Sequence, residues 1–174
     1  ISKLSKYSAV NAQVNAANVG YHSMRNYKKI DCVIINEKEI RHELRDRNGT
    51  INDLMKRLSQ EQDIKNLVVT RGTRGSVLYN KKNRKFIMCD AYARTSIDKI
   101  GAGDAMLSAI SLCLKCGLHK DLSLLIASLA AAQSVMTIGN KETINKDKIL
   151  KKCIKLKHQD LPDPRPYLYK SKKI

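Results

Sequence analysis

The sequence predicts an α/β fold in which helices pack on a doubly wound sheet, and two patterns carry this prediction. Short, unbroken apolar runs at residues 32–35 and 67–69 are typical of strands that are buried on both faces of a parallel sheet. Between them, residues 51–62 place apolar side chains three and four positions apart, which is the pattern of an amphipathic helix. Polar or glycine-rich segments follow both strands directly, at the sheet edge where doubly wound folds bind ligands.

The other elements of the first half follow in order. A loose helical spacing over residues 11–27 predicts a first helix, although Gly20 interrupts it. A second helix is expected at residues 40–46. Residues 76–79 and 85–88 alternate or cluster apolar side chains around a polar connection, so they are predicted to form a pair of strands.

Helices dominate the prediction for the second half. The helix after Gly103 is apolar nearly all round, so we expect it to be buried in the centre of the domain, with Gly117 at its end. Asp121 is predicted to cap the next helix, over residues 122–137, and Gly139 to close it.

The length and composition fit one folded domain followed by a tail. With 174 residues and 43% hydrophobic content, the chain can bury a sizeable core. Asn145 is predicted to cap a last helix that ends at Leu156, which sets a domain over residues 1–158. Three prolines and several basic residues make residues 159–174 an extended basic tail. Because the chain begins with Ile1, we expect it to be a piece of something longer.

The charge of +17 raises the alternative of a polyanion-binding surface. Lys and Arg are spread over the whole length, however, and one Phe with no Trp offers little surface for stacking bases. We therefore do not expect nucleic acid as a partner. The longest apolar stretch is broken by polar residues and too short to span a bilayer, so no membrane partner is expected.

The five cysteines favour a cytoplasmic protein with reduced thiols, because they are odd in number and most lie in apolar segments. Cys113 and Cys116 form a C-x-x-C pair within an apolar helical run. Core packing is the favoured reading over a zinc or redox site, because no second pair or suitably spaced histidine accompanies it.

The segment Gly101-Ala102-Gly103-Asp104 has the features of a phosphoryl-transfer site. It opens a helix, whose first N–H groups lack intrahelical partners and carry the positive end of the macrodipole. The two glycines let an anion approach the backbone. Asp104 would face the same cavity as the bound anion, and its carboxylate could accept a proton from a hydroxyl group.

Two further motifs follow the predicted buried strands. Asn36 and Glu39 form N-x-x-E, and their oxygen atoms suit the hard ion Mg²⁺; a polar helix start has the same pattern. Thr70, Gly72 and Gly75 form T-x-G-x-x-G, in which bare backbone could contact a phosphate or ribose. An ordinary glycine-rich turn between strands is the alternative.

Taken together, these motifs resemble those of the ribokinase (PfkB) family of carbohydrate kinases. The resemblance covers residues 31–156 and matches only the C-terminal half of the family domain. The helix-start motif extends back to Asp98 as D-x-x-G-A-G-D, and the resemblance links Asp98 to the monovalent-cation site of some members. Lys99 stands where the family has Thr, which weakens that link. Within the family, the motifs look most like the heptose 7-phosphate kinase type.

The resemblance implies a role for each motif. The backbone amides of G-A-G stabilise charge on the transferred phosphoryl group in the family and the final Asp is the catalytic base, which assigns these roles to Gly101, Ala102, Gly103 and Asp104. Asn36 and Glu39 are implied to lie near Mg²⁺, largely through water. The implied nucleotide-binding residues are Thr70, Gly72, Gly75, Ser128, Ala131 and Ala132. The last three would leave room for the adenine, although close helix packing explains small residues equally well.

The implied function is phosphoryl transfer from Mg-ATP to a hydroxyl of a sugar or sugar phosphate, with ATP as co-substrate and Mg²⁺ as cofactor. Residues 1–158 would be the nucleotide-binding part of a ribokinase-like doubly wound domain, without the N-terminal half that binds the sugar. The isolated chain is thus expected to be inactive, and an exposed sheet edge favours a homodimer. A non-catalytic nucleotide- or polyanion-binding module is the alternative. The dinucleotide-binding fingerprint G-x-G-x-x-G is not matched, because Met106 stands where its third glycine should be. The Walker motif G-x-x-x-x-G-K-[ST] of many NTPases does not occur in the sequence either.

Overall fold

The structure is a computed structural model that describes residues 6–11, 23–93, 101–135 and 144–156. It divides into two compact units, residues 1–91 and residues 92–174. Each unit is described by itself below.

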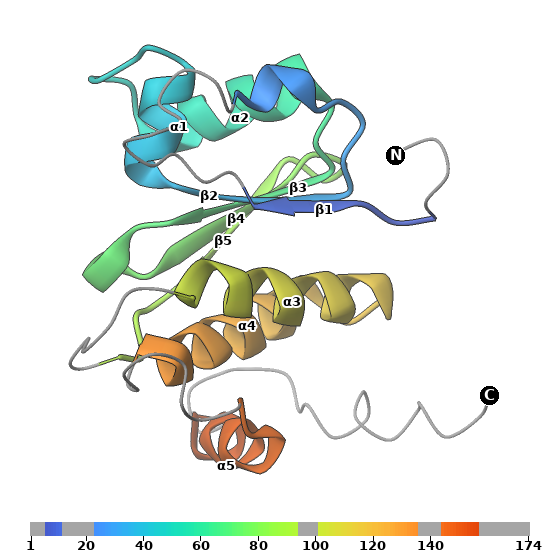
Figure 1. Ribbon diagram of the computed structural model, residues 1–174, viewed down its shortest axis with the longest axis vertical. Helices are drawn as coiled ribbons and strands as arrows, with labels where there is room; N and C mark the ends of the chain where they lie inside the picture. The colour runs from blue at the N-terminus through green and yellow to red at the C-terminus, as the bar shows by residue number, and fades with distance from the viewer. Residues whose placement is uncertain (1–5, 12–22, 94–100, 136–143, 157–174) are drawn as a thin grey trace. The chain divides into compact units, whose positions relative to one another are not determined.

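A mixed five-stranded sheet forms the centre of the first unit (Figure 1). The strands are β1 (Ala9–Asn11), β2 (Cys32–Asn36), β3 (Asn66–Thr70), β4 (Ser76–Asn80) and β5 (Lys85–Cys89), and they lie in sequence order. The first three strands run parallel, whereas β4 and β5 pair antiparallel with their neighbours. The α/β fold class is therefore confirmed.

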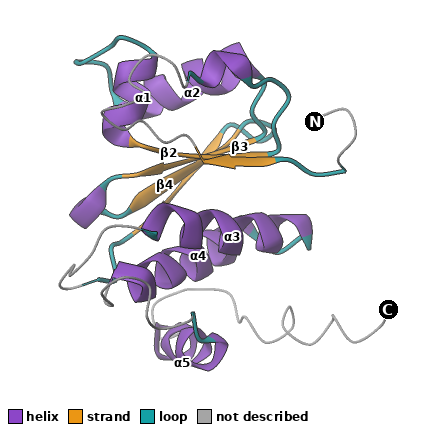
Figure 2. Ribbon diagram, viewed as in Figure 1, coloured by secondary structure: helices purple, strands orange, loops and turns teal. Residues whose placement is uncertain are grey.

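Two helices, α1 (Glu37–Glu43) and α2 (Ile51–Gln62), cover one face of this sheet (Figure 2). The described part of the unit also contains two short 3₁₀ turns, η1 (Met24–Asn26) and η2 (Gly72–Arg74). Alternate strand residues point toward the helices, because side chains in a strand alternate between its two faces. The core they form with the helices contains Met24, Val33, Ile35, Ile40, Leu54, Met55, Leu58, Leu67, Val69, Val77 and Tyr79.

The boundaries of α2 follow from its end residues. The Thr50 hydroxyl accepts a hydrogen bond from the backbone N–H of Asp53 at 3.2 Å and so caps the start of the helix. Asp63 ends the helix in a left-handed conformation, with φ at 55°, which Asp tolerates better than most residues. The helix predicted over residues 51–62 is confirmed at both ends.

The second unit contains α3 (Ala102–Lys115), α4 (Lys120–Val135) and α5 (Lys146–Leu156) (Figure 1). Beyond the end of α3, the N–H of Leu118 donates to the Cys113 carbonyl and that of Gly117 to the Leu114 carbonyl, which is a Schellman motif. Gly117 thus stands at the predicted position. The Asn145 side chain accepts from the N–H groups of Asp147 and Lys148, which confirms it as the cap of α5.

Two predictions for the first half need correction. The helix expected at residues 40–46 spans Glu37–Glu43 instead, because the capping box of Asn36 and Glu39 starts it earlier. The helix predicted over residues 11–27 is wrong where the structure describes it, because Asn11 ends strand β1 and residues 24–26 form a 3₁₀ turn. The same result adds β1 to the predicted sheet. Three residues are too few to display a strand period, and this strand forms by pairing with β2.

Two further corrections concern the second half. Asp121 lies within the first turn of α4, and the His119 carbonyl accepts the first helical bond instead. The Asp121 carboxylate contacts His119 Nδ1 at 2.7 Å. The buried environment predicted for α3 is wrong on one side, where Leu112 is 64% exposed; α4 is the more extensively buried helix. Its predicted end at Gly139 lies outside the described residues.

Candidate functional site

The N-x-x-E and T-x-G-x-x-G motifs begin side by side at one edge of the sheet. In the parallel register of β2 and β3, Asn36 is the partner of Thr70. Each is the last residue of its strand, so α1 and the η2 turn both start from this edge. Such an edge, at the carboxyl ends of parallel strands, is where open α/β sheets bind ligands.

Asn36 and Glu39 form a reciprocal capping box at the start of α1. The Asn36 Oδ1 accepts from the N–H of Glu39 at 2.8 Å, and Glu39 Oε2 accepts from the N–H of Asn36 at 2.9 Å. The polar helix start considered above is therefore present. It does not compete with a water-mediated metal site, because amide and carboxylate oxygens each have two lone pairs.

The turn after β3 owes its shape to Gly75. Its φ of 76° and ψ of −141° are accessible almost only to glycine. A Cβ atom added there would lie 2.0 Å from the carbonyl oxygen of Cys89 on strand β5. Gly72 also has a positive φ, of 61°, but a Cβ there would meet nothing within 4 Å. Gly75 is thus required for packing, while Gly72 leaves open space beside the backbone.

Glu37 was not singled out from the sequence, yet it connects α1 to this turn. Its Oε2 accepts from Arg71 Nε at 3.0 Å and from Arg74 Nη2 at 2.7 Å, and its Oε1 accepts from Arg41 Nη2 at 3.1 Å. The pair with Arg41, four residues on, could have been read from the helix spacing. The other two pairs span more than thirty residues and depend on the fold.

We expect the first unit to lose stability in acid, because several of its carboxylates have lowered pKa values in the folded state. Burial alone would raise the pKa of Glu37, but hydrogen bonds from Arg71 and Arg41 and the charges of Arg74 and Arg71 hold it below its usual range. The pKa of Asp31 is lowered against its burial by Lys65 and Ser8, and that of Asp63 is lowered by Lys81. Protons therefore bind the unfolded chain more readily than the folded one below the ordinary Glu value of 4.5.

We expect the urea midpoint to be nearly constant above pH 5 and to fall steadily as the pH is lowered from about 4.5 to 3. The reason is that stability present above the unfolded-state pKa is lost as each folded carboxylate becomes protonated. Urea titrations at four pH values measure this, and Glu37→Gln should show a shallower fall than the unaltered chain. A midpoint unchanged down to pH 3 would contradict these ion pairs.

The Gly101-Ala102-Gly103-Asp104 motif opens α3 in the second unit. Gly101 is the N-cap residue, with a left-handed φ of 85°, and it makes no side-chain cap. The next three residues occupy the first helical positions, where backbone N–H groups have no intrahelical acceptor. Asp104 is exposed in this first turn, at the positive end of the helix dipole. The leading Asp98 of the motif lies outside the described residues.

The three small residues proposed for the adenine site share one face of α4, because they are three and four positions apart. Ser128 and Ala132 are buried and Ala131 is half-buried. The first unit thus holds the predicted metal residues and the T-x-G-x-x-G turn, and the second holds the G-A-G-D motif and this small-residue face.

Core packing, the favoured reading of the C-x-x-C pair, does not hold for both residues, because Cys113 is half-buried and Cys116 is exposed. None of the five cysteines forms a disulfide in the described residues. Burial, with smaller contributions from Cys116 and Cys153, raises the pKa of Cys113 to about 11, so it is a neutral thiol at neutral pH. Among the described residues, no group of three or more His, Cys, Asp or Glu side chains could hold a metal ion. Within the same residues, no helix has the length and apolarity needed to cross a membrane.

Solved structures of sugar kinases share the fold. Ribokinase from Thermotoga maritima is 21% identical with a TM-score of 0.70, over 88% of this chain and 51% of that one. Arabidopsis thaliana ribokinase, complexed with ribose and ATP, is 24% identical with a TM-score of 0.58, over 70% and 40%. Phosphofructokinase-2 from Escherichia coli, in complex with substrates and products, is 18% identical with a TM-score of 0.70, over 87% and 48%.

The chain therefore spans about half the length of these kinases. No curated protein sequence matches it. The family model described as pfkB family carbohydrate kinase matches residues 8–147. With that match over most of its length and the ribokinase fold in its structure, the chain belongs to the pfkB family of carbohydrate kinases.

Proposed function

We propose that this chain is the nucleotide-binding and catalytic-base half of an ATP-dependent carbohydrate kinase. The reaction would move the terminal phosphoryl group of Mg-ATP to a hydroxyl of a sugar or sugar phosphate. The observation that carries the proposal is the start of α3, where Gly101 supplies no side-chain cap to the first backbone N–H groups and the exposed carboxylate of Asp104 lies in the same helical turn. An anion site and a proton acceptor together are what phosphoryl transfer to a hydroxyl requires.

Each part of the site has a proposed task. The N–H groups of Ala102 and Gly103 would stabilise charge on the transferred group, and Asp104 would take the proton of the attacking hydroxyl. The Thr70–Gly75 turn would contact the nucleotide through its backbone, and the small face of α4 would accommodate the adenine. The open space beside the Gly72 backbone supports the first assignment, and the small size of the side chains on α4 supports the second.

Asn36 and Glu39 would hold Mg²⁺ through water molecules. Mg²⁺ keeps several waters and is bound in nucleotide sites by one or two carboxylates plus phosphates, and Glu39 would be the carboxylate here. The ion would neutralise charge on the phosphates. Asp98 remains a candidate for a monovalent-cation site.

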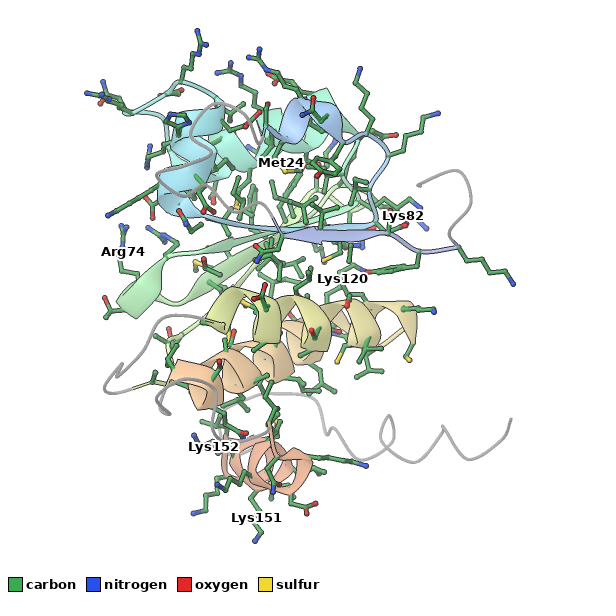
Figure 3. The ribbon with its side chains drawn as sticks, viewed as in Figure 1. Met24, Arg74, Lys82, Lys120, Lys151 and Lys152 are labelled. Atoms are coloured by element: carbon green, nitrogen blue, oxygen red, sulfur yellow. The ribbon has the colours of Figure 1, made fainter. Side chains whose placement is uncertain are left out.

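Equilibrium binding tests the proposal. By calorimetry, the chain should bind Mg-ADP with a Kd below about 1 mM, a typical upper range for kinase substrates, and bind ADP more weakly in EDTA. Binding of RNA that falls steeply with salt, with no response to Mg-ADP, would favour the polyanion-binding alternative instead. The lysines of α5, including Lys151 and Lys152 (Figure 3), would be the surface involved.

Gly103→Val is expected to abolish most of the stabilisation that Mg-ADP gives in a thermal-shift experiment. A β-branched side chain would occupy the proposed anion site and crowd the first turn of α3. Ala109→Val, further along the same helix, is the matched control and should retain the shift. A ligand-induced shift that is equal in the two variants would remove the anion site from the proposal.

The isolated chain is expected not to phosphorylate sugars at an enzyme's rate, even if it binds nucleotide. Holding two substrates in line contributes about 7–11 kcal/mol to such reactions, and the chain covers only half of the related kinases. Residues 1–158 would form the nucleotide part and residues 159–174 a tail. The measurement is ADP release with a panel of hexoses and heptose phosphates, and sugar-dependent release above one per second would contradict the expectation.

A further inference from the structure

We infer that Glu37 is a positioning residue that fixes the start of α1 against the η2 turn, and thereby aligns the metal side of the site with the nucleotide side. The inference rests on the proposed function. It assigns a task to Glu37, which occupies one of the two variable positions of the N-x-x-E motif, between Asn36 and Glu39.

The contacts of Glu37 join segments that are distant in sequence. Its Oε2 receives hydrogen bonds from Arg71 and Arg74, which lie 34 and 37 residues further along the chain. The carboxylate is only 13% exposed, and Arg71 is 22% exposed. Hydrogen bonds between ions in such a shielded place are shorter and stronger than neutral ones. The pair is therefore a fixed connection between α1 and the turn.

This connection lies directly beside the proposed ligands. Glu37 follows Asn36 and Arg71 follows Thr70, and those two preceding residues are register partners at the sheet edge. The backbone N–H of Arg71 also donates to the Gly75 carbonyl at 2.8 Å, which closes the turn. Fixing the Arg71 side chain on Glu37 thus fixes both ends of the turn relative to the capping box of α1.

Arg41 extends the same network to the loop between α1 and α2. Its Nη2 donates to Glu37 Oε1, while its Nη1 donates to the carbonyls of Arg47 and Gly49 at 3.0 and 2.9 Å. The short helix α1 is therefore held at both its first turn and the loop that follows it. The Glu37 carboxylate accordingly joins α1 to Arg71 and Arg74 of the turn, and it also holds Arg41 of the same helix toward the following loop.

The charges of Glu37 and its arginine partners also affect which ligands this edge of the sheet favours. Three guanidinium groups surround one carboxylate, so a net positive charge remains at this edge of the sheet. Arg74 is 61% exposed and extends from the turn at the surface (Figure 3). An excess of positive charge beside the proposed nucleotide motif favours an anionic ligand. Glu37 holds these charges in place without cancelling them.

The test compares two carboxylates at opposite ends of strand β2. Asp31 precedes β2 and is 17% exposed, with an ion pair to Lys65 at 2.7 Å. Asp31→Asn and Glu37→Gln therefore remove one shielded, cross-element carboxylate each. We expect both variants to melt at a lower temperature, but only Glu37→Gln to raise the Kd of Mg-ADP, by about tenfold, as loss of supporting partners of metal ligands typically does.

A second variant separates alignment from loss of folding. Arg71→Lys keeps the positive charge but loses the Nε–H that reaches Glu37, and should raise the Kd about threefold with little change in melting temperature. If Glu37 acts through Arg71, the double variant should bind Mg-ADP no more weakly than Glu37→Gln alone.

The possible results separate the positioning role of Glu37 from a general loss of stability and from failure of the proposed function. An unchanged Kd in both Glu37→Gln and Arg71→Lys, with the unaltered chain binding normally, overturns the positioning role and leaves the proposed function intact. The same increase in Kd for Asp31→Asn as for Glu37→Gln also overturns it, because a general loss of stability would explain both. An unaltered chain that binds no Mg-ADP overturns the proposed function, and the inference with it.

Discussion

Asp104→Asn, made in a complete kinase that contains this chain, is expected to lower turnover by about 10²- to 10⁴-fold, the usual contribution of a general base. The amide keeps the size and polarity of the carboxylate but cannot accept a proton from the substrate hydroxyl. Asp104 lies exposed in the first turn of α3, so the substitution should leave the helix folded.

The control for this prediction is Asp121→Asn, which changes an acidic residue in the first turn of α4. It should leave turnover within about twofold, because no part of the proposed chemistry uses this side chain. Steady-state kinetics and Mg-ADP binding measure both effects. Asp104→Asn should bind Mg-ADP as the unaltered enzyme does, and unaltered turnover in this variant would exclude Asp104 as the base.

Gly75→Ala is expected to destabilise the chain by about 3 kcal/mol or more, a large part of the 5–15 kcal/mol typical of a folded domain. The added Cβ would lie 2.0 Å from the Cys89 carbonyl oxygen, so strand β5 or the turn would have to move. The backbone conformation itself adds strain for any residue except glycine. Urea unfolding measures the loss.

Gly72→Ala provides the matched control in the same turn. It carries a positive φ but has nothing within 4 Å of its Cβ, so only the conformational cost of about 1–2 kcal/mol applies. The difference between the two variants isolates the clash with β5. Equal destabilisation by both would show that β5 does not pack against the turn as described.

Local signals in the sequence were sufficient for most elements. The apolar runs of β2 and β3 and the periodicity of α2 locate these elements to within a residue or two. Gly117 marks the C-terminal end of α3 and Asn145 marks the start of α5, and the hydrogen bonds of both involve residues close in sequence. Such features depend on neighbouring residues, which is why a sequence reveals them.

Features that arise from distant contacts were missed. Strand β1 exists because it pairs with β2, more than twenty residues away, and three residues contain no recognisable period. The Glu37 network depends on β3 lying beside β2. The exposed side of α3 was missed for a similar reason, since an all-round apolar composition does not specify which face is covered. The motifs themselves could be read, but their supporting contacts could not.

The measurement that tests the account most directly is a titration of the ¹⁵N-labelled chain with Mg-ADP, followed by amide NMR shifts. At 19.6 kDa the chain suits this method. The account predicts that the largest shifts occur at Thr70–Gly75, at Gly101–Asp104 and on the Ser128–Ala132 face of α4. Shifts confined to the lysine-rich α5, or no saturable shifts at all, would contradict the claim that this chain is the nucleotide-binding half of a carbohydrate kinase.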